Sequence, residues 1–213
     1  MTLTIQIQQQ RFLLHASGAI FWKDKNMLLI SDVHLGKVAH FRKHGIAIPN
    51  ETIFENFIRL TKVVNFFKPQ SIVFLGDLFH SKINKEWDLF SSWTQSISAK
   101  IFLIEGNHDI VAKYKYTDLQ IEIFKEWVVD GFLLTHYPEE RQGVYNFCGH
   151  IHPGIKLKGS GKQSLKLPCF FQSEKQLILP AFGEFTGNFY LTPKGNDNVY
   201  AITKDEVILV AGS

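Results

Sequence analysis

Short apolar runs, each followed directly by polar residues, recur along the first two thirds of the chain. Runs of four to six apolar residues that are rich in β-branched and aromatic side chains predict buried strands. These runs are "NMLLI" before Ser31, "SIVFL" before Gly76, "KIFLIE" before Gly106, "GFLLT" before His136 and "VYNFC" before Gly149. Each predicted strand therefore ends on residues able to bind a metal ion or to move a proton.

Two segments between these strands have helical spacing. A helix is expected over residues 50–67, with Asn50 as its N-cap and Lys68-Pro69 ending it. Its expected inner face carries Ile53, Phe54, Phe57, Ile58, Thr61 and Val64. A second helix is expected over residues 84–97, where one face carries Trp87, Phe90, Trp93 and Ile97. The order strand, helix, strand implies right-handed crossovers and a parallel sheet in the first half.

From about Ile121 onwards, strand follows strand with only turn residues between them. "SLKLPCFF", "QLILPAF", "NVYAI" and "EVILV" predict a second, mixed or antiparallel sheet packed against the first. The expected fold class is therefore α/β, with two packed mixed β-sheets flanked by helices, in a single domain of residues 1–213. Sites in open α/β sheets lie beyond the carboxyl ends of the strands, so the polar clusters are expected to meet on one rim.

Composition narrows the class of protein. With 213 residues, 45% hydrophobic and including 19 Phe, the chain has enough apolar volume for one sizeable core. The apolar runs are too short to span a bilayer and the first ten residues lack a secretory pattern, so we expect a cytoplasmic protein without a membrane partner. The two cysteines, Cys148 and Cys169, are expected to be buried and reduced. The net charge of +3 permits an anionic partner without requiring one.

Metal-binding side chains gather at the predicted strand ends: Asp32, His34, Asp77, Asn107, His136, His150 and His152. Carboxylate, amide and imidazole ligands suit Mn, Fe, Zn or Co, and the lack of cysteine among them argues against a structural zinc site. Seven ligands are too many for one ion and suit two ions that share a carboxylate, as in enzymes that displace phosphoryl groups. Alternate residues of an extended backbone point to one side, so both members of Asp-x-His and of His-x-His are expected to face the site.

The motifs "DVH", "GD", "GNHD", "H" and "GHIH", in this order, resemble those of the calcineurin-like metallophosphoesterases. The resemblance implies a four-layer sandwich with two divalent metal ions. One ion would be held by Asp32, His34 and His152, the other by Asn107, His136 and His150, and Asp77 would bridge them. It also implies that His108 is the general acid that protonates the leaving oxygen and that Asp109 orients the His108 imidazole.

Longer stretches are similar to a bacterial branch, the DNA-ligase-associated metallophosphoesterases, which is close to the SbcD nucleases. These stretches are "SDVHLGKVAHFRKHGIAIP", "GDLFHSKINKEW" and "LPAFGEFTGN", and with the five motifs they extend from about Ser31 to Asn188. The similarity implies a manganese-dependent phosphodiesterase that acts as an endonuclease in DNA repair, associated with an ATP-dependent DNA ligase, a helicase and another nuclease. The chain departs from the branch at "THYP", where Tyr137 replaces the more usual Glu and is expected to alter the surroundings of His136.

Several basic or aromatic residues are candidates for contacts with DNA. Arg42 lies in a predicted basic helix with Lys37, His40, Lys43 and His44, which either binds phosphates or is an ordinary solvated face. His80 either helps to position DNA, as a histidine near this place does in related nucleases, or is a solvent-facing turn residue. The segment "GIKLKGSGKQSLK" is expected to be a hairpin connection, or alternatively a loop whose lysines contact phosphates: Lys156, Lys158, Lys162 and Lys166. Trp87 and Trp93 are expected in the core rather than stacked on bases.

Two other functions stay open at this point. A phosphodiesterase of small molecules, or a nucleotide pyrophosphatase, would use the same metal ligands. A metal-free protein-binding scaffold of the same fold is disfavoured because all seven ligands and His108 are present.

Overall fold

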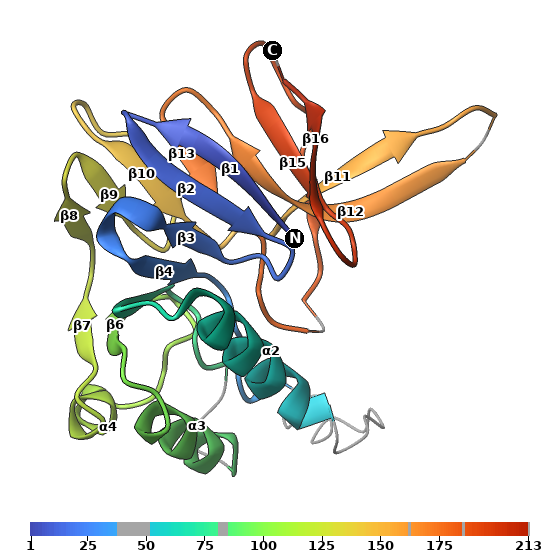
Figure 1. Cartoon of the computed structure of the whole chain (residues 1–213). Coiled ribbons are helices and arrows are strands. Elements are labelled where there is room, and N and C mark those ends of the chain that lie inside the picture. Colours follow the sequence, from blue (N-terminus) through green and yellow to red (C-terminus); the bar gives the residue numbers. More distant parts are fainter. Residues whose placement is uncertain (38–51, 81–84, 162, 185, 213) are drawn as a thin grey trace.

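The computed structural model describes residues 1–37, 52–80, 85–161, 163–184 and 186–212. Within these ranges the strands form two sheets that pack face to face, and the α-helices lie on one side of the pair (Figure 1). The expected α/β fold class with two packed mixed sheets is confirmed. No described helix is both long enough and apolar enough to cross a membrane.

The first sheet has seven described strands in chain order. They are β1 (Thr2–Ile7), β2 (Gln10–His15), β3 (Ile20–Trp22), β4 (Met27–Ile30), β5 (Ser71–Leu75), β6 (Lys100–Ile104) and β7 (Glu122–Phe124), with the short 3-10 helix η1 (Lys23–Lys25) before β4. Strands β4 to β7 are parallel, as the strand–helix–strand order predicted. The antiparallel strands β1, β2 and β3 were not predicted, and they widen the sheet on its N-terminal side.

The second sheet has nine described strands and is mixed. They are β8 (Trp127–Val129), β9 (Phe132–Leu134), β10 (Tyr145–Cys148), β11 (Pro153–Lys158), β12 (Ser164–Gln172), β13 (Gln176–Ile178), β14 (Phe189–Tyr190), β15 (Asn198–Ile202) and β16 (Val207–Ala211). Strands β9, β10 and β13 run parallel, whereas β11 and β12 form an antiparallel hairpin. The segment expected to be a hairpin connection thus contributes two strands of the sheet.

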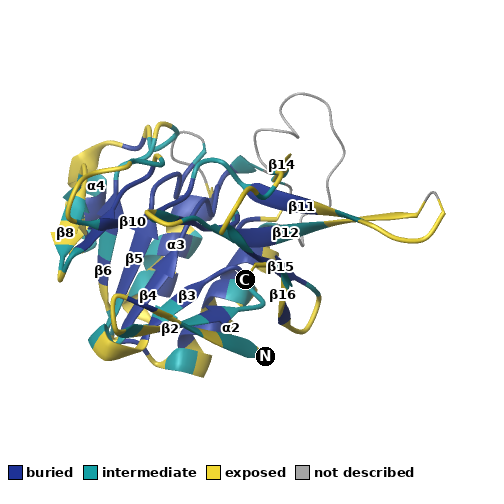
Figure 2. Cartoon of the chain, turned by 90° about the horizontal axis from the view of Figure 1, so that it is seen from above, coloured by how far each residue is buried: buried dark blue, intermediate teal, exposed yellow. Residues whose placement is uncertain are grey.

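Aromatic side chains fill the space between the two sheets. Phe12 and Trp22 of the first sheet meet Phe132 and Phe147 of the second, and all four are fully buried. The Phe12 and Phe147 ring centroids lie 4.9 Å apart, within the range of favourable aromatic pairs. Burying one such side chain stabilises the fold by about 1.5–3 kcal/mol. Figure 2 shows the buried residues concentrated in the central strands and the exposed ones at the hairpin ends.

Helices α2 (Thr52–Phe67), α3 (Lys85–Gln95) and α4 (Lys113–Asp118) cover the outer face of the first sheet. Trp87 and Trp93 are buried in this layer, as expected for core residues. The predicted inner face of α2 was partly wrong, because Phe54 and Ile58 are 49% and 43% exposed. Phe57 and Val64 are buried as predicted, and Asn56, Leu60 and Val63 complete the buried face. Among the described residues, no helix covers the outer face of the second sheet.

The predicted rim exists where the carboxyl ends of β4, β5, β6, β9 and β10 meet. Backbone hydrogen bonds join the segments that leave these strands. The N–H of Asp32 donates to the carbonyl of Gly76 at 3.2 Å, and the N–H of His34 donates to Asp77 at 2.9 Å. The N–H of Gly149 donates to the carbonyl of His136 at 3.0 Å. The polar clusters are therefore held on a shared backbone framework.

Candidate metal centre

Five of the seven predicted ligands adopt a left-handed backbone conformation. The φ angles of Asp32, His34, Asp77, His150 and His152 lie between 50° and 67°. Residues other than glycine rarely adopt this conformation, which costs on the order of 1 kcal/mol or more at each position and collects at functional sites. The expectation of an extended backbone through Asp-x-His and His-x-His was therefore wrong. These residues form tight turns beyond the strand ends.

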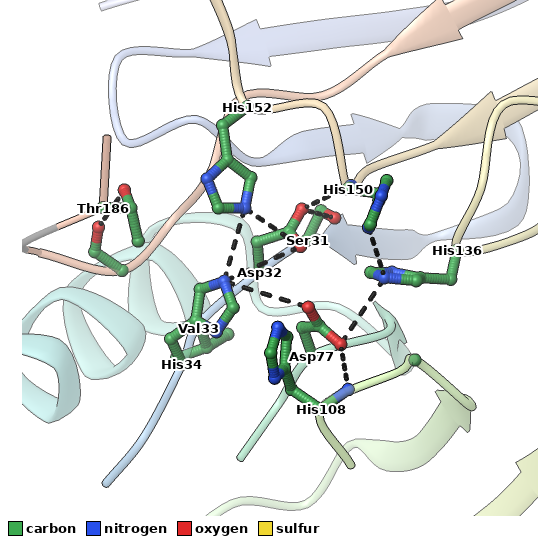
Figure 3. Close-up of polar contacts among 12 residues, drawn as sticks. Ser31, Asp32, Val33, His34, Asp77, His108, His136, His150, His152 and Thr186 are labelled. Atoms are coloured by element: carbon green, nitrogen blue, oxygen red, sulfur yellow. Dashed lines mark hydrogen bonds and ion pairs between the residues drawn. The ribbon is translucent and has the colours of Figure 1, made fainter. Parts of the chain in front are cut away.

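The first group of ligands consists of Asp32, His34 and His152 (Figure 3). The Nε2 atoms of His34 and His152 lie 3.3 Å apart, and the His152 Nε2 lies 3.3 Å from the Asp32 Oδ1. The His34 Nε2 is 4.0 Å from the same oxygen. Three ligand atoms thus surround one small space.

The second group consists of Asp77, His136 and His150, and Asn107 joins it. The His136 Nε2 lies 3.1 Å from the His150 Nδ1, 3.4 Å from the Asp77 Oδ1 and 3.0 Å from the Asn107 Oδ1. The other Asp77 oxygen, Oδ2, faces the His34 Nε2 of the first group at 4.0 Å. The Asp77 carboxylate therefore lies between the two groups, and His150 and His152 belong to different ones.

These separations fit a pair of metal ions. Neighbouring ligands bound at about 2.0–2.2 Å to one ion lie about 2.8–3.6 Å from each other in octahedral or tetrahedral geometry. The Nδ1 of His136 lies 3.0 Å from the carbonyl oxygen of Leu75, and the Nδ1 of His152 lies 3.2 Å from that of Gly187. Donation from Nδ1–H in both rings leaves each Nε2 as a free lone pair directed at its group.

Burial and charge at the first group also call for a cation. The Oδ1 atom of Asp32 is fully buried and has no hydrogen-bond partner. The Ser31 hydroxyl donates to the other oxygen, Oδ2, whereas Oδ1 faces the His152 Nε2 at 3.3 Å. Burial lowers the pKa of His34 to about 3, which keeps its imidazole in the neutral form that binds metals. The donor set therefore fits divalent ions.

Three residues that support the turns were not predicted. The Ser31 hydroxyl donates to the Asp32 Oδ2, which also accepts from the His150 N–H at 2.9 Å. On α2, the buried Asn56 accepts a hydrogen bond at 3.0 Å from the N–H of Glu184, and its amide faces the Val33 carbonyl at 3.5 Å. On α3, Glu86 accepts from the Gly36 N–H at 2.6 Å. The sequence signal for Asn56 was a polar residue between apolar helix positions.

Close approach explains the glycines that precede the ligands. A Cβ atom at Gly149 would overlap the Ser31 hydroxyl and the Asp32 carboxylate, and one at Gly76 would overlap the ring of His136. At Gly106 a Cβ would overlap the carboxylate of Asp77. Each glycine therefore allows one strand-end segment to lie directly against a ligand of another.

His108 lies beside the two groups without joining either. Its ring centroid is 5.8 Å from that of His34 and 4.4 Å from that of His80, and its backbone N–H donates to the Asp77 Oδ1 at 2.9 Å. Asp109 differs from its predicted role, because its carboxylate accepts hydrogen bonds from the N–H groups of Phe79, at 3.0 Å, and Gly106, at 2.9 Å. No hydrogen bond found in the described structure joins Asp109 to the His108 ring, so Asp109 holds the two loops together.

Other candidate residues are placed as follows. Arg42, His40, Lys43 and His44 lie outside the described residues. Lys37 is half-buried, and burial lowers its pKa. The Tyr137 ring, 49% exposed, packs at 4.3 Å from the ring of His150 and 4.8 Å from that of His136. Burial raises the pKa of the Cys148 thiol, which fits a small apolar residue rather than a ligand.

Two solved structures are similar to this chain. The chain resembles the crystal structure of Pseudomonas putida nuclease MPE with a TM-score of 0.81 and 28% identity, over 99% of this chain and 100% of that one. It resembles the phosphoesterase Yfce from E. coli more weakly, with a TM-score of 0.43 and 15% identity over 88% and 99% of the two chains. A comparison with curated protein sequences gives no match.

A scan of protein families matches residues 25–157 to the family described as calcineurin-like phosphoesterase. This match covers more than half of the chain, and it includes both groups of candidate ligands. The chain belongs to the calcineurin-like phosphoesterase family of metal-dependent phosphoester hydrolases.

Proposed function

We propose that the chain is a dinuclear-metal phosphodiesterase that cleaves DNA internally. The observation that carries the proposal is the pair of ligand groups that face the two oxygens of Asp77. Two divalent ions held by these groups would supply the positive charge that neutralises a phosphodiester and lowers the pKa of an attacking water.

In this proposal each part of the rim has one task. Asp32, His34 and His152 would hold one ion, Asn107, His136 and His150 would hold the other, and Asp77 lies between the two groups. His108, half-buried beside the groups, donates a proton to the leaving oxygen, and the neighbouring His80 ring restricts the position of the His108 ring. Asp109 contributes indirectly, through the loops that present Asp77 and Asn107.

DNA is the proposed substrate for two reasons. The similar Pseudomonas putida protein is a nuclease, and the similarity covers both chains almost completely. The rim is also open to solvent, because Asn107 is exposed and His108, His150 and His152 are half-buried. A polymer can therefore reach the ions without entering an enclosed cavity.

Manganese is the proposed physiological metal, because oxygen and imidazole ligands without cysteine suit it, although Fe, Zn and Co have similar preferences. We further propose a role in DNA repair in the cytoplasm, together with an ATP-dependent DNA ligase, a helicase and another nuclease. Metal content of the purified protein and co-purification with these three partners test these points.

The test of cleavage uses a covalently closed DNA circle, which has no ends for an exonuclease, and a small chromogenic phosphodiester. Wild type with Mn should cleave both, Asp77→Asn should cleave neither, and Asp118→Asn, exposed at the end of α4, serves as the matched control. Cleavage of the small ester alone would favour the small-molecule phosphodiesterase or pyrophosphatase. Failure to cleave either substrate with Mn, Fe, Zn or Co would refute the proposal.

A further inference from the structure

The β11–β12 hairpin begins directly at the metal centre and extends beyond the body of the protein. Its first residue, Pro153, follows the ligand His152. Figures 1 and 2 show the outer part of the hairpin extending past the other strands of the second sheet, where it is exposed. We name residues 153–161 and 163–168 the arm; Lys162, at its end, lies outside the described residues.

The two faces of the arm differ in character. Strand register places Lys156 opposite Lys166 and Lys158 opposite Ser164, so these residues share one face. The other face carries Ile155, Leu157, Leu165 and Leu167. Near the base of the arm, Ile155, Leu157 and Leu167 pack with Cys169, Val199 and Ala201. The apolar side therefore anchors the arm to the second sheet, and the lysine side remains exposed.

The lysine face has no negative charge to balance it. The arm contains no Asp or Glu, and in the described part of the chain Lys156, Lys158 and Lys166 form no salt bridge. Like charges directly opposite each other in a hairpin are destabilising. The fold does not need the Lys156–Lys166 pair for its stability, and an anionic partner would compensate for their repulsion.

An aromatic ring extends this face towards the metal centre. The Lys166 Nζ lies 5.1 Å from the centroid of the Tyr190 ring, a cation–π contact. β14 pairs with β11 so that Tyr190 lies opposite Gly154, where an added Cβ would come within 3.0 Å of the ring. The ring is 40% exposed and can stack on a base while Lys166 contacts the adjoining phosphate.

The spacing of the lysines suits a polynucleotide. Along an extended strand at about 3.3 Å per residue, Lys156 and Lys158 lie about 13 and 20 Å from His152. With about 3.4 Å per nucleotide along a strand, these distances correspond to about four and six nucleotides. A dinucleotide or small ester at the metal centre would not reach them.

We propose that the lysine face of the arm binds the phosphate backbone of a DNA strand about four to six nucleotides from the scissile bond. This inference rests on the proposed function, and it specifies the substrate as a strand long enough to span both sites. Tyr190 stacks on a base of the same strand.

The test replaces Lys156, Lys158 and Lys166 together by Gln, which keeps side-chain length and removes the charge. The matched control replaces Lys23, Lys68 and Lys100, which are exposed at the opposite ends of β4, β5 and β6. For a single-stranded 30-mer, the arm variant should raise KM on the order of tenfold, with kcat little changed. The slope of log KM against log salt should fall by about 2, because each lost phosphate contact removes about 0.7. Activity on the chromogenic ester should equal that of wild type, which also shows that the variant folds.

Each alternative result has a distinct meaning. If wild type cleaves the 30-mer but the arm variant has the same KM and the same salt slope, the arm does not bind DNA, and the proposed function stands. Its lysines would then be available to bind an acidic protein partner. An equal rise in KM and an equal fall in the salt slope in the control triple variant would also refute binding by the arm, because the change would then reflect net charge. If wild type cleaves the ester but no DNA, both the proposed nuclease function and the proposed binding of DNA by the arm are wrong.

Discussion

Replacing Asp32 by Asn is expected to make the metal-free protein more stable and the manganese-loaded protein less stable than wild type. Asp32 is fully buried, and its Oδ1 has no hydrogen-bond partner. Leaving a buried acceptor unsatisfied costs about 1–3 kcal/mol, and more when it is charged. The carboxylate is therefore a local cost that only a bound cation offsets.

Asparagine has nearly the same shape and satisfies its neighbours without a cation. Its oxygen can replace Oδ2 and accept from the His150 N–H, which now lies at 2.9 Å. Its amide nitrogen then occupies the position of Oδ1 and donates to the His152 Nε2, 3.3 Å away. In the presence of a chelator, the free energy of unfolding should therefore be about 1–3 kcal/mol higher for the variant than for wild type. For a chain of this size, each kcal/mol raises Tm by about 2–4 °C.

Manganese should reverse the order of stability. Saturation at about one thousand times Kd stabilises wild type by about 4.1 kcal/mol, which exceeds the advantage of the variant in chelator, and the variant should lose most of this gain because an anionic ligand is missing. Thermal unfolding of wild type and of Asp32→Asn, each in EDTA and in excess Mn, measures the four Tm values that this prediction compares. Asp118→Asn, exposed at the end of α4, is the control and should change neither.

Two results would contradict this reasoning. A variant less stable than wild type in EDTA would mean that the Asp32 carboxylate is satisfied in the metal-free protein. Full stabilisation of the variant by Mn would mean that Asp32 is not a ligand.

Three further predictions concern other parts of the chain. His108→Ala should lower kcat for DNA by about 10²–10⁴-fold, and by less for an ester with an acidic leaving group, which needs no proton donor. Mn should stabilise this variant as much as wild type. If it does not, His108 is a metal ligand rather than the general acid. Burial lowers the pKa of His15 from 6.5 to about 4, so the folded state favours the neutral ring and stability is lost as pH falls from 6.5 towards 4. In His15→Asn, the decrease in the free energy of unfolding between pH 7 and pH 4.5 should be smaller by about 1 kcal/mol, after allowance for the partial exposure of His15. Urea unfolding in EDTA measures this decrease, and the same dependence on pH in both proteins would refute the prediction. Gly149→Ala should destabilise the protein by about 1–3 kcal/mol and weaken Mn binding, because its Cβ meets Asp32, whereas Gly187→Ala, which has open space, should do neither.

Several residues lie on elements that the sequence patterns identified correctly but have other positions or contacts than the patterns predicted. Periodicity identified α2, yet it assigned Phe54 and Ile58 to the inner face, because two apolar stripes lie side by side on this helix. The polar Asn56 is buried instead, since its amide binds backbone groups of two rim segments. Asp109 lies next to His108 in the sequence, but its carboxylate is directed to the N–H groups of Phe79 and Gly106. Hydrophobic periodicity contains no information about where buried backbone groups need partners.

The sequence by itself determined the strands that end on polar residues, the residue types at those ends and the rim on which they meet. It did so because buried parallel strands are short continuous apolar runs and because their carboxyl ends share one edge of a sheet. The resemblance to the metallophosphoesterases already implied how the ligands divide into two groups, but only the tertiary structure supplies the physical reason for that division. His150 and His152 are two residues apart, yet His152 meets His34 across 118 residues of sequence while His150 meets His136. Left-handed turns at these positions direct the side chains, and such turns are stable only when packing and hydrogen bonds from distant segments hold them in place.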